Sequence, residues 1–546
     1  MRIFNYFFRP VFCAALCISI NVQAQTVTVP ASLPKNWHTM DLQKDGYYGI
    51  SLDNAYQFLK GKTSRPVVVA TLDSGIDTLQ KDLKSILWTN AKEIPGNGID
   101  DDKNGFIDDI HGWNFLGGPG GKCDVNETVE EVREYHRLKG KYLTLTEASA
   151  TDKKEYAYWL LIKKTYDATL AKSRSEMEMF SPVMNVLMAT SPIIKRELKL
   201  KPNDVFTQKD LDRLVARNDT LVQSKNLWRS FFQEEGSTSN SAKVIKNLAE
   251  YLSKINNDVN PDLDARKRIV GDDPDKQDDK KYGSNLLKFQ DAQHGTMVAG
   301  LIGAVRGNNY GINGIADNVK IMALKTGPNG DEYDKDVANG IRYAVDNGAK
   351  VLNMSFGKKI SPHKDWVDAA FKYAADHDVL LVQASGNDNQ DVDAELDYPN
   401  DTFADGSTTD ADNVINVGAS GPRKDNTLAA DFSNYGKKNV DLFAPGFKVT
   451  SVTNDSEVDT EDGTSFSAPI VTGIAALILE YYPNLSARQV KEAILRSASP
   501  LSGLMVNKPG DKDKKVDFTS LSRTGGVVNA YQALLIASKM KGERKN

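Results

Sequence analysis

The sequence predicts an α/β protein with a doubly wound, mostly parallel sheet, helices on both faces, and a mainly helical insertion. Apolar, β-branched runs such as 66–72 and 379–384 alternate with segments of helical periodicity, as buried parallel strands do. Between about residues 125 and 270 this alternation gives way to Lys/Glu-rich helical periodicity. At 546 residues the chain is long enough to bury a large core.

The first residues are typical of a signal peptide. Two arginines precede an apolar stretch from 11 to 20, and a Val-Gln-Ala sequence ends at Ala24. The stretch is too short for a membrane-spanning helix. We therefore expect residues 1–24 to be removed and the chain to be exported, to the periplasm or outside the cell. A lipoprotein anchor at Cys17 has less support, because Leu16 stands where a small residue is expected.

Composition narrows the partners. A net charge of −5 and a pI near 5.8 speak against a nucleic-acid partner and provide no basic patch for a membrane surface. No other apolar run of spanning length follows the leader, so no transmembrane span is expected in the mature chain. Cys123 is the one cysteine after the leader, which predicts no intramolecular disulfide.

A carboxylate follows the first strand. The run from 66 to 72 ends in Asp73-Ser74-Gly75-Ile76. Ligands bind at the carboxyl edge of open α/β sheets, so Asp73 is a candidate site residue. Taken alone, an aspartate at this position is more often a turn or capping residue.

Residues 98–109 are similar to a calcium-binding loop. Asp100, Asp102, Asn104 and Asp108 fall at loop positions 1, 3, 5 and 9, and a glycine stands at position 6. The glutamate that usually closes such a loop is replaced by His111. We expect a structural Ca²⁺ at the four oxygen-bearing residues. The alternative is a solvated acidic turn.

The insertion is expected to contain several helices, at 129–143, 155–179, 207–215 and 242–255. Thr207 and Asp210 have the spacing of a capping box. No nucleophile or metal-spaced cluster stands out in this part of the sequence. The charged run from Asp272 to Lys281 is expected to be disordered or an exposed loop.

Regular α/β alternation resumes at Gln293-His294-Gly295, which opens a helix of small residues. The expected strands are 320–325, 350–356, 379–384, 414–419, 441–443 and 449–452, and the expected helices are 337–347, 365–377, 486–497 and 528–534. Another helix follows Gly463 and is apolar on every face, so it should be buried. Pro469 suits its first turn.

Ser465 stands at the start of that buried helix, where unpaired N–H groups and the helix dipole can stabilise an oxyanion. A lone Thr-Ser before a helix is more often an N-cap. A nucleophile also needs a base, an orienting carboxylate and oxyanion donors. His294 is the preferred base among the six histidines, because Gly295 and the small residues after it leave room for a substrate backbone beside the ring. Asn387 offers a side-chain amide, although alone it would be a turn residue.

These four residues occur in the order Asp, His, Asn, Ser, each in a turn at the end of a strand or the start of a helix. Three segments resemble the aspartate, histidine and serine motifs of the subtilisin-like serine proteases, the subtilases; they are Asp73-Ser74-Gly75-Ile76, His294-Gly295-Thr296 and Gly463-Thr464-Ser465-x-Ser467-Ala468-Pro469. The order differs from that of chymotrypsin and of the α/β-hydrolases. The resemblance runs from about residue 60 to about 538 once 112–283 is left out, and it implies a subtilisin-like fold.

The resemblance implies a role for each residue. Ser465 would be the nucleophile, His294 the general base and then acid, and Asp73 the orienting carboxylate. Asn387 would donate to the oxyanion together with the backbone N–H of Ser465. Losing such an amide donor in subtilisin costs about 3–4 kcal/mol of transition-state stabilisation.

The resemblance also assigns substrate-binding segments. Ser355-Phe356-Gly357 is similar to the segment that pairs with extended substrate, and Ala384-Ser385-Gly386 to the opposite pocket wall. Asp397 lies near the floor of the first specificity pocket of subtilases, where a carboxylate would favour Arg or Lys before the cleaved bond. The alternative for Asp397 is an exposed loop carboxylate.

The sequence therefore predicts an exported serine endopeptidase that acts on proteins or peptides through an acyl-enzyme and needs no organic cofactor. We divide the chain into a signal peptide (1–24), an N-terminal segment (25–62), a discontinuous peptidase domain (63–124 and 284–540) and an insertion with a charged linker (125–283). Two alternatives stay open. One is an inactive, protease-shaped binding protein, and the other is a narrow processing protease whose insertion restricts access or aids folding.

Overall fold

The computed structural model describes residues 33–235, 239–407 and 410–544; the predicted signal peptide and Cys17 lie outside them. A seven-stranded sheet with the order β2-β5-β1-β6-β7-β8-β9 forms the centre of the protein, and every neighbouring pair is parallel. The strands are β1 (Val67–Asp73), β2 (Gly112–Asn114), β5 (Val319–Lys325), β6 (Val351–Met354), β7 (Leu380–Ala384), β8 (Val414–Ser420) and β9 (Leu442–Pro445).

Strand β1 lies inside the sheet between β5 and β6, and its apolar run is buried except at the half-buried Val68. In the parallel register Asp73 lies opposite Lys325. Because parallel strands end at the same edge, the turns after β6 and β7 open beside Asp73. The sheet thus gathers the segments at 355–357 and 384–387 around the end of β1.

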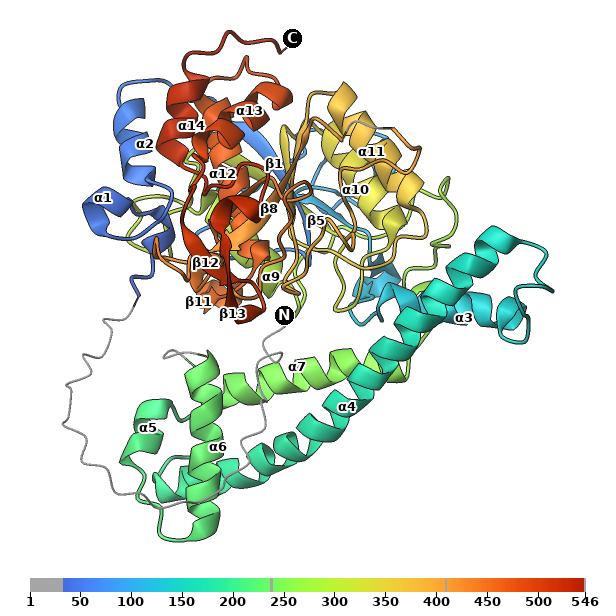
Figure 1. Cartoon of the computed structure of the whole chain (residues 1–546), viewed down its shortest axis with the longest axis vertical. Helices are drawn as coiled ribbons and strands as arrows, with labels where there is room; N and C mark the ends of the chain where they lie inside the picture. The colour runs from blue at the N-terminus through green and yellow to red at the C-terminus, as the bar shows by residue number, and fades with distance from the viewer. Residues whose placement is uncertain (1–32, 236–238, 408–409, 545–546) are drawn as a thin grey trace.

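Helices cover both faces of this sheet (Figure 1). One face carries α2 (Leu52–Leu59), α9 (Gln293–Gly303), α12 (Thr464–Tyr481), α13 (Ala487–Ser497) and α14 (Ala530–Ala537), and the other carries α10 (Asp334–Asp346) and α11 (Lys364–Asp376). Alternate strand residues point into the two cores: Val69 packs with the first set of helices and Ala70 with the second. The doubly wound α/β class is confirmed.

Helix α12 is the central helix of the protein. Its residues are buried except Ser465 and Tyr481. Among the described residues it is the one helix long and apolar enough to cross a membrane, but 89% of it is buried inside the protein, as expected for a core helix. Pro469 stands in its second turn, so the prediction that it occupies the first turn was wrong.

The insertion forms an elongated helical arm beside the sheet domain (Figure 1). Its helices are α3 (Glu130–Tyr142), α4 (Lys153–Glu197), α5 (Gln208–Arg213), α6 (Asp219–Glu235), α7 (Ser241–Val259) and α8 (Ala265–Ile269). Phe180, Leu187, Trp228 and Leu248 belong to a hydrophobic core of its own, formed by α4 to α7. The capping box of Thr207 is present at the start of α5.

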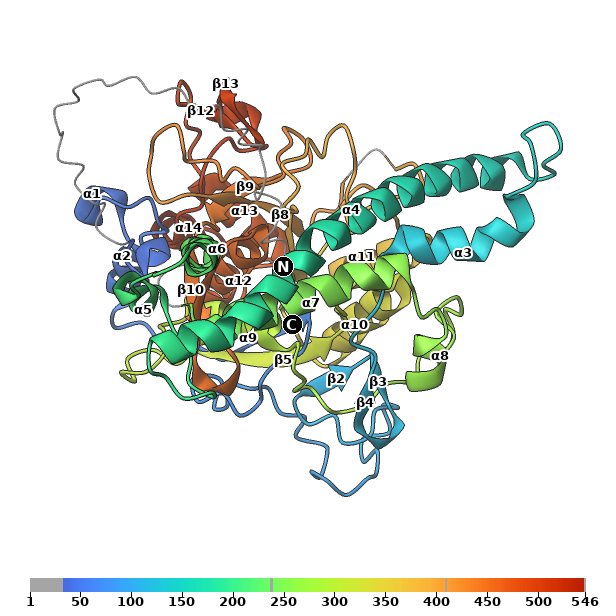
Figure 2. The same ribbon diagram turned by 90° about the horizontal axis from the view of Figure 1, so that it is seen from below.

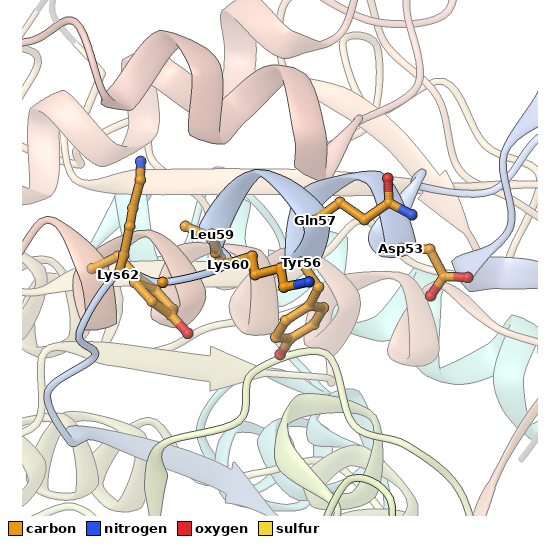
Figure 3. Close-up of a pocket in the computed structure, with 8 residues that line it drawn as sticks. Asp53, Tyr56, Gln57, Leu59, Lys60 and Lys62 are labelled. Carbon is orange, nitrogen blue, oxygen red and sulfur yellow. The ribbon is translucent and has the colours of Figure 1, made fainter.

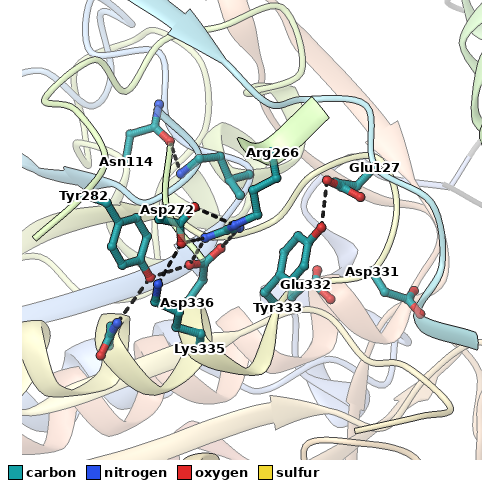
Figure 4. A network of polar contacts seen from close by, with 12 residues as sticks. Asn114, Glu127, Arg266, Asp272, Tyr282, Asp331, Glu332, Tyr333, Lys335 and Asp336 are labelled. Carbon is teal, nitrogen blue, oxygen red and sulfur yellow. Dashed lines mark hydrogen bonds and ion pairs between the residues drawn. The ribbon is translucent and has the colours of Figure 1, made fainter. Parts of the chain in front are cut away.

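The expectation of an exposed or disordered linker at 272–281 was wrong for Asp272. Its side chain is 1% exposed and bonds to Arg266, 2.7 Å away, and to Lys335, 2.8 Å away (Figure 4). Arg266 also lies 2.7 Å from Asp336 of α10, which accepts a hydrogen bond from Tyr282 at 2.5 Å. This buried network joins the end of the insertion to the sheet domain.

The remaining elements lie outside the main sheet. They are α1 (Leu42–Asp45) and three antiparallel pairs: β3 (Gly117–Gly118) with β4 (Lys122–Cys123), β10 (Val449–Val452) with β11 (Val458–Glu461), and β12 (Met505–Lys508) with β13 (Asp511–Asp517). The strand expected at 449–452 therefore forms, but in a hairpin. Strand β11 leads directly into Gly463 and α12.

Candidate active site

Asp73 and His294 meet at the carboxyl edge of the sheet. Asp73 ends β1, and His294 is the second residue of α9. The Nδ1 atom of His294 lies 2.7 Å from Oδ1 of Asp73, although 221 residues separate them in the chain. The Asp73 side chain is 4% exposed and that of His294 is 35% exposed. A buried carboxylate that accepts from Nδ1–H leaves Nε2 of a solvent-reaching ring to take up a proton.

Gly295 permits this contact. A Cβ atom at Gly295 would lie 2.1 Å from the carbonyl oxygen of Gly75 and 3.1 Å from Oδ1 of Asp73. The Gly295 N–H donates to Oγ of Ser74 at 3.1 Å. The glycine therefore lets α9 approach the turn after β1. Our expectation that it leaves room for substrate was wrong, because the space is filled by that turn.

Ser465 is the second residue of α12, and its Oγ donates to the carbonyl oxygen of Ser355 at 3.1 Å. The Oγ of Ser355 in turn donates to the carbonyl oxygen of Ser465 at 2.8 Å. Pro469 explains the second bond, because a proline has no N–H for the carbonyl four residues earlier. The Ser355 hydroxyl satisfies that acceptor and ties the turn after β6 to the start of α12.

Asn387 lies against the same helix start. Its Oδ1 accepts from the backbone N–H of Thr464 at 2.8 Å and from the Thr464 hydroxyl at 2.9 Å. Since Oδ1 is held twice, Nδ2 is the end of the amide that can donate into the cleft. The N–H of Ser465 is in the first turn of α12, where backbone donors have no partner within the helix. The two donors lie near each other, because a Cβ atom built on Gly463 would be 3.6 Å from the Ser465 nitrogen and 3.7 Å from Nδ2 of Asn387.

One cleft of about 1540 Å³ brings all of these groups together. Every catalytic and substrate-binding candidate lines it, namely Asp73, His294, Ser355, Phe356, Gly357, Ala384, Ser385, Gly386, Asn387, Asp397 and Ser465. Asn434 organises one wall, because its Nδ2 donates to the carbonyl of Ser385 at 2.9 Å and to Asp397 at 2.7 Å. No motif points to Asn434, since its partners are 37 and 49 residues away in sequence.

Asp397 is not an exposed loop carboxylate. Its side chain is 14% exposed and its Oδ1 lies 2.5 Å from Nζ of Lys359. Lys359 also lies 3.3 Å from Asp388. The cation opposes the charge that would attract an Arg or Lys side chain of a substrate. Lys359 was not among the residues selected from the sequence, because a lysine in the loop between β6 and α11 carries no motif.

The acidic loop holds a cluster that differs from the predicted ligand set. Carboxylate oxygens of Asp100, Asp102 and Glu93 all lie within 4.8 Å of one another. The Asp108 carboxylate instead accepts from the backbone N–H groups of residues 96, 97 and 98, at 2.7, 3.2 and 2.9 Å. Asn104 donates from Nδ2 to Asp109 at 3.0 Å. Glu93 precedes the loop, so loop spacing could not reveal it.

A smaller cavity of about 460 Å³ lies beside α2 (Figure 3). It is lined by Asp53, Tyr56, Gln57 and Leu59 of that helix, the following residues 60–62, and Tyr481. None of the residues selected from the sequence lines it. Residues of the aspartate, histidine and serine motifs line the larger cleft and not this cavity.

Comparison with known proteins agrees with this arrangement. The subtilase family model matches residues 64–526. The chain is 36% identical over 221 residues to the cell wall-associated protease of Bacillus subtilis (strain 168), covering 40% of this chain and 23% of that protein. It is 33% identical over 294 residues to the thermophilic serine proteinase of Bacillus sp. (strain AK1), covering 52% and 65%.

Subtilisin DY of Bacillus licheniformis is 35% identical over 212 residues, which covers 38% of this chain and 71% of that protein. The chain spans less than two thirds of the length of the first two relatives. The family model, by contrast, extends over most of this chain, insertion included. The chain therefore belongs to the subtilase family of serine proteases.

Proposed function

We propose that this protein is an exported serine endopeptidase that hydrolyses peptide bonds through an acyl-enzyme. The observation that carries the proposal is the 2.7 Å contact between His294 and Asp73 in the cleft that Ser465 lines. In this mechanism Nε2 of His294 takes the proton from Oγ of Ser465 as the hydroxyl attacks the carbonyl carbon. The ring then gives that proton to the leaving amine. In the second half of the reaction His294 activates a water molecule, which attacks the acyl carbon and releases Ser465.

The other groups act on charge and position. Asp73 holds the ring in the tautomer that leaves Nε2 free for proton transfer and stabilises the imidazolium. Nδ2 of Asn387 and the N–H of Ser465 stabilise the oxyanion. An extended substrate backbone lies between the segments 355–357 and 384–386, where main-chain pairing provides affinity with little sequence selectivity.

The test is active-site labelling with a fluorophosphonate. The wild type should be labelled and Ser465→Ala should not. Ser467→Ala is the matched control, because Ser467 belongs to the same motif but is buried and donates to the carbonyl of Ala444. Labelling of Ser465→Ala at the wild-type level would refute the assignment. An unlabelled wild type that folds normally would favour the inactive, protease-shaped binding protein.

Export rests on the predicted signal peptide, and the cell wall-associated relative supports it. N-terminal sequencing of the secreted protein should begin at Gln25, after the predicted cleavage site. A blocked, lipid-modified Cys17 would instead establish a membrane anchor.

We also propose a structural Ca²⁺ on the acidic loop, with Glu93, Asp100 and Asp102 as carboxylate ligands. The convergence of these side chains supports it, since Ca²⁺ prefers several carboxylate oxygens. Asp108 then shapes the loop through the backbone. Calcium should raise the melting temperature of the Ser465→Ala protein, and Asp100→Asn should abolish that increase. An equal increase in both proteins would exclude this site.

A further inference from the structure

The active-site cleft has two walls of different origin. The sheet domain supplies the wall with His294 and Ser465. The insertion supplies the opposite wall through α3, α4, α6 and α7, with Glu131, Thr169, Lys172, Glu176, Phe232, Lys243, Asn247, Glu250, Lys254 and Asp258 among its residues. Seen from below in Figure 2, α4 and α7 lie across the sheet domain. The insertion thus covers the catalytic centre.

Helix α7 is built for this position. Lys243, Asn247, Glu250, Lys254 and Asp258 recur every three or four residues and line the cleft, so they form one polar stripe along the helix. Val244 and Leu248 are fully buried in the core of the insertion, whereas Tyr251 and Ile255 also border the cleft. The helix therefore presents a mainly polar surface to the cleft, and its buried apolar side packs against the rest of the insertion.

Both ends of α7 are attached to the rest of the protein. Near its start, Lys243 forms an ion pair with Asp459 of β11, the strand that leads into the Ser465 turn. Near its end, Oδ1 of Asp258 accepts from the hydroxyl of Thr128 at 2.9 Å, and Oδ2 accepts from Ser173 of α4 at 3.2 Å. Lys243 thus joins the start of α7 to the sheet domain, and Asp258 joins its end to the first residues of the insertion and to α4.

We propose that α7 is a roof over the catalytic cleft, closed by the Lys243–Asp459 ion pair, which limits the substrates of the proposed peptidase to extended, unfolded polypeptide segments. This inference rests on the proposed function. A folded protein brings its whole surface to a protease, and here the insertion forms one wall of the cleft that Ser465 lines. A single extended chain needs only the width of one strand between the two walls. A folded substrate must first unfold locally to enter.

The ion pair is the part of the roof that can be tested without disturbing either core. The side chains of Lys243 and Asp459 are 23% and 11% exposed, so the contact lies at the margin of the cleft. Lys243→Ala should release the start of α7 from β11 while the apolar core of the insertion stays intact. Lys246→Ala is the matched control, because Lys246 lies on the same helix, is 56% exposed, and pairs only weakly with Glu250, 3.8 Å away.

The experiment compares one protein in two states, native ribonuclease A and its reduced, carboxymethylated form, together with a short fluorogenic peptide. The wild type should cleave the unfolded form and the peptide, and cleave the native form at least about tenfold more slowly. Lys243→Ala should lower the ratio of the cleavage rate of unfolded to that of native ribonuclease A by about threefold or more. The kcat/KM for the peptide should change by less than about twofold. Lys246→Ala should behave as the wild type.

A charge swap makes the test specific for the ion pair. Lys243→Asp alone should lower the ratio of unfolded to native cleavage rates, and adding Asp459→Lys should restore the wild-type ratio. Faster amide hydrogen exchange in α7 of Lys243→Ala would report the same opening directly. If Lys243→Ala leaves both the ratio of cleavage rates and the amide exchange in α7 unchanged, the proposal that α7 restricts the substrates is refuted. The proposed peptidase function would not be affected by that result. Failure of the wild type to cleave the peptide would instead refute the proposed function.

Discussion

The ammonium group of Lys359 lies 2.5 Å from Oδ1 of Asp397 at the wall of the cleft. This pairing decides what the Asp397 carboxylate can do for specificity. A carboxylate that already has a cation beside it gains less from a cationic substrate side chain, so we expect no strong preference for Arg or Lys before the cleaved bond in the wild type.

Removing that cation should create such a preference. In Lys359→Met the carboxylate keeps its bond from Asn434 but loses its counter-charge. The ratio of kcat/KM for an Arg peptide to that for a matched Phe peptide should rise about tenfold, equivalent to about 1.4 kcal/mol. Lys359→Arg retains the charge and should keep the wild-type ratio. Equal ratios in the Met variant and the wild type would place Asp397 outside the specificity pocket.

Asp73→Asn should reduce kcat much more than it changes KM. The Asp73 Oδ1 atom accepts from the backbone N–H of Ser74 at 2.7 Å as well as from His294, so an asparagine can keep an acceptor there but lacks the negative charge that stabilises the imidazolium. A loss in kcat on the order of 10⁴ is expected, as for the same change in the triad of a serine protease. Steady-state kinetics with a peptide substrate measure this. A loss below about tenfold would show that Asp73 does not orient the base.

Arg266 and Arg268 offer a matched pair for stability. Arg266 is 3% exposed between Asp272 and Asp336, whereas Arg268 is 58% exposed beside Asp262. Removing one member of a buried ion network leaves uncompensated charge, so Arg266→Met should lower the free energy of unfolding by about 3–5 kcal/mol. Arg268→Met should change it by less than about 1 kcal/mol. Denaturant unfolding in the Ser465→Ala background measures both changes. Similar losses of unfolding free energy in the two variants would show that the buried network does not stabilise the fold.

Glu480 predicts a pH dependence of stability. Burial, and a hydrogen bond to the Asp317 carboxyl, raise the pKa of Glu480 to about 9 from a reference value of 4.5. The folded protein therefore keeps this group protonated. Its contribution to the free energy of unfolding is fully present below pH 4.5. That contribution falls by about 1 kcal/mol per pH unit as the pH rises toward 9, and it is lost once the pH passes 9.

Glu480→Gln should remove that loss, because a neutral amide can make the same hydrogen bonds at every pH. Its melting temperature should match that of the parent near pH 4.5 and exceed it increasingly toward pH 9, with both proteins carrying Ser465→Ala. Glu492→Gln is the control, since Glu492 is 45% exposed beside Arg496. Parallel pH profiles for Glu480→Gln and its parent would contradict the prediction.

The sequence predicts the sheet well because its strands are long apolar runs. Strands such as β1 and helices such as α12 are almost wholly apolar, so their composition alone predicts that they are buried. Strand β2, by contrast, is Gly112-Trp113-Asn114 and becomes a strand only by pairing with β5. Helix α4 extends to Glu197, well beyond the predicted end at 179, because Pro182 and Pro192 are accommodated inside it.

The site divides in the same way. Asp73, His294 and Ser465 each lie in a motif that can be recognised locally, and the resemblance that these motifs carry also assigns Asn387. Glu93, Asn434 and Lys359 act through partners brought together by tertiary structure, which no spacing encodes. Asp272 is the clearest case, because a run of charges is solvated unless distant side chains such as Lys335 neutralise it.

The position of β1 in the middle of the sheet has a consequence for the newly made chain. Both neighbours of β1 are synthesised only after the whole insertion, and His294 follows Asp73 by 221 residues. Closing so large a loop costs entropy before any native pairing repays it, so this step is late and slow. Until then the Asp73 carboxylate and the His294 ring are far apart, so the pair that the proposed catalysis needs exists only in the folded protein.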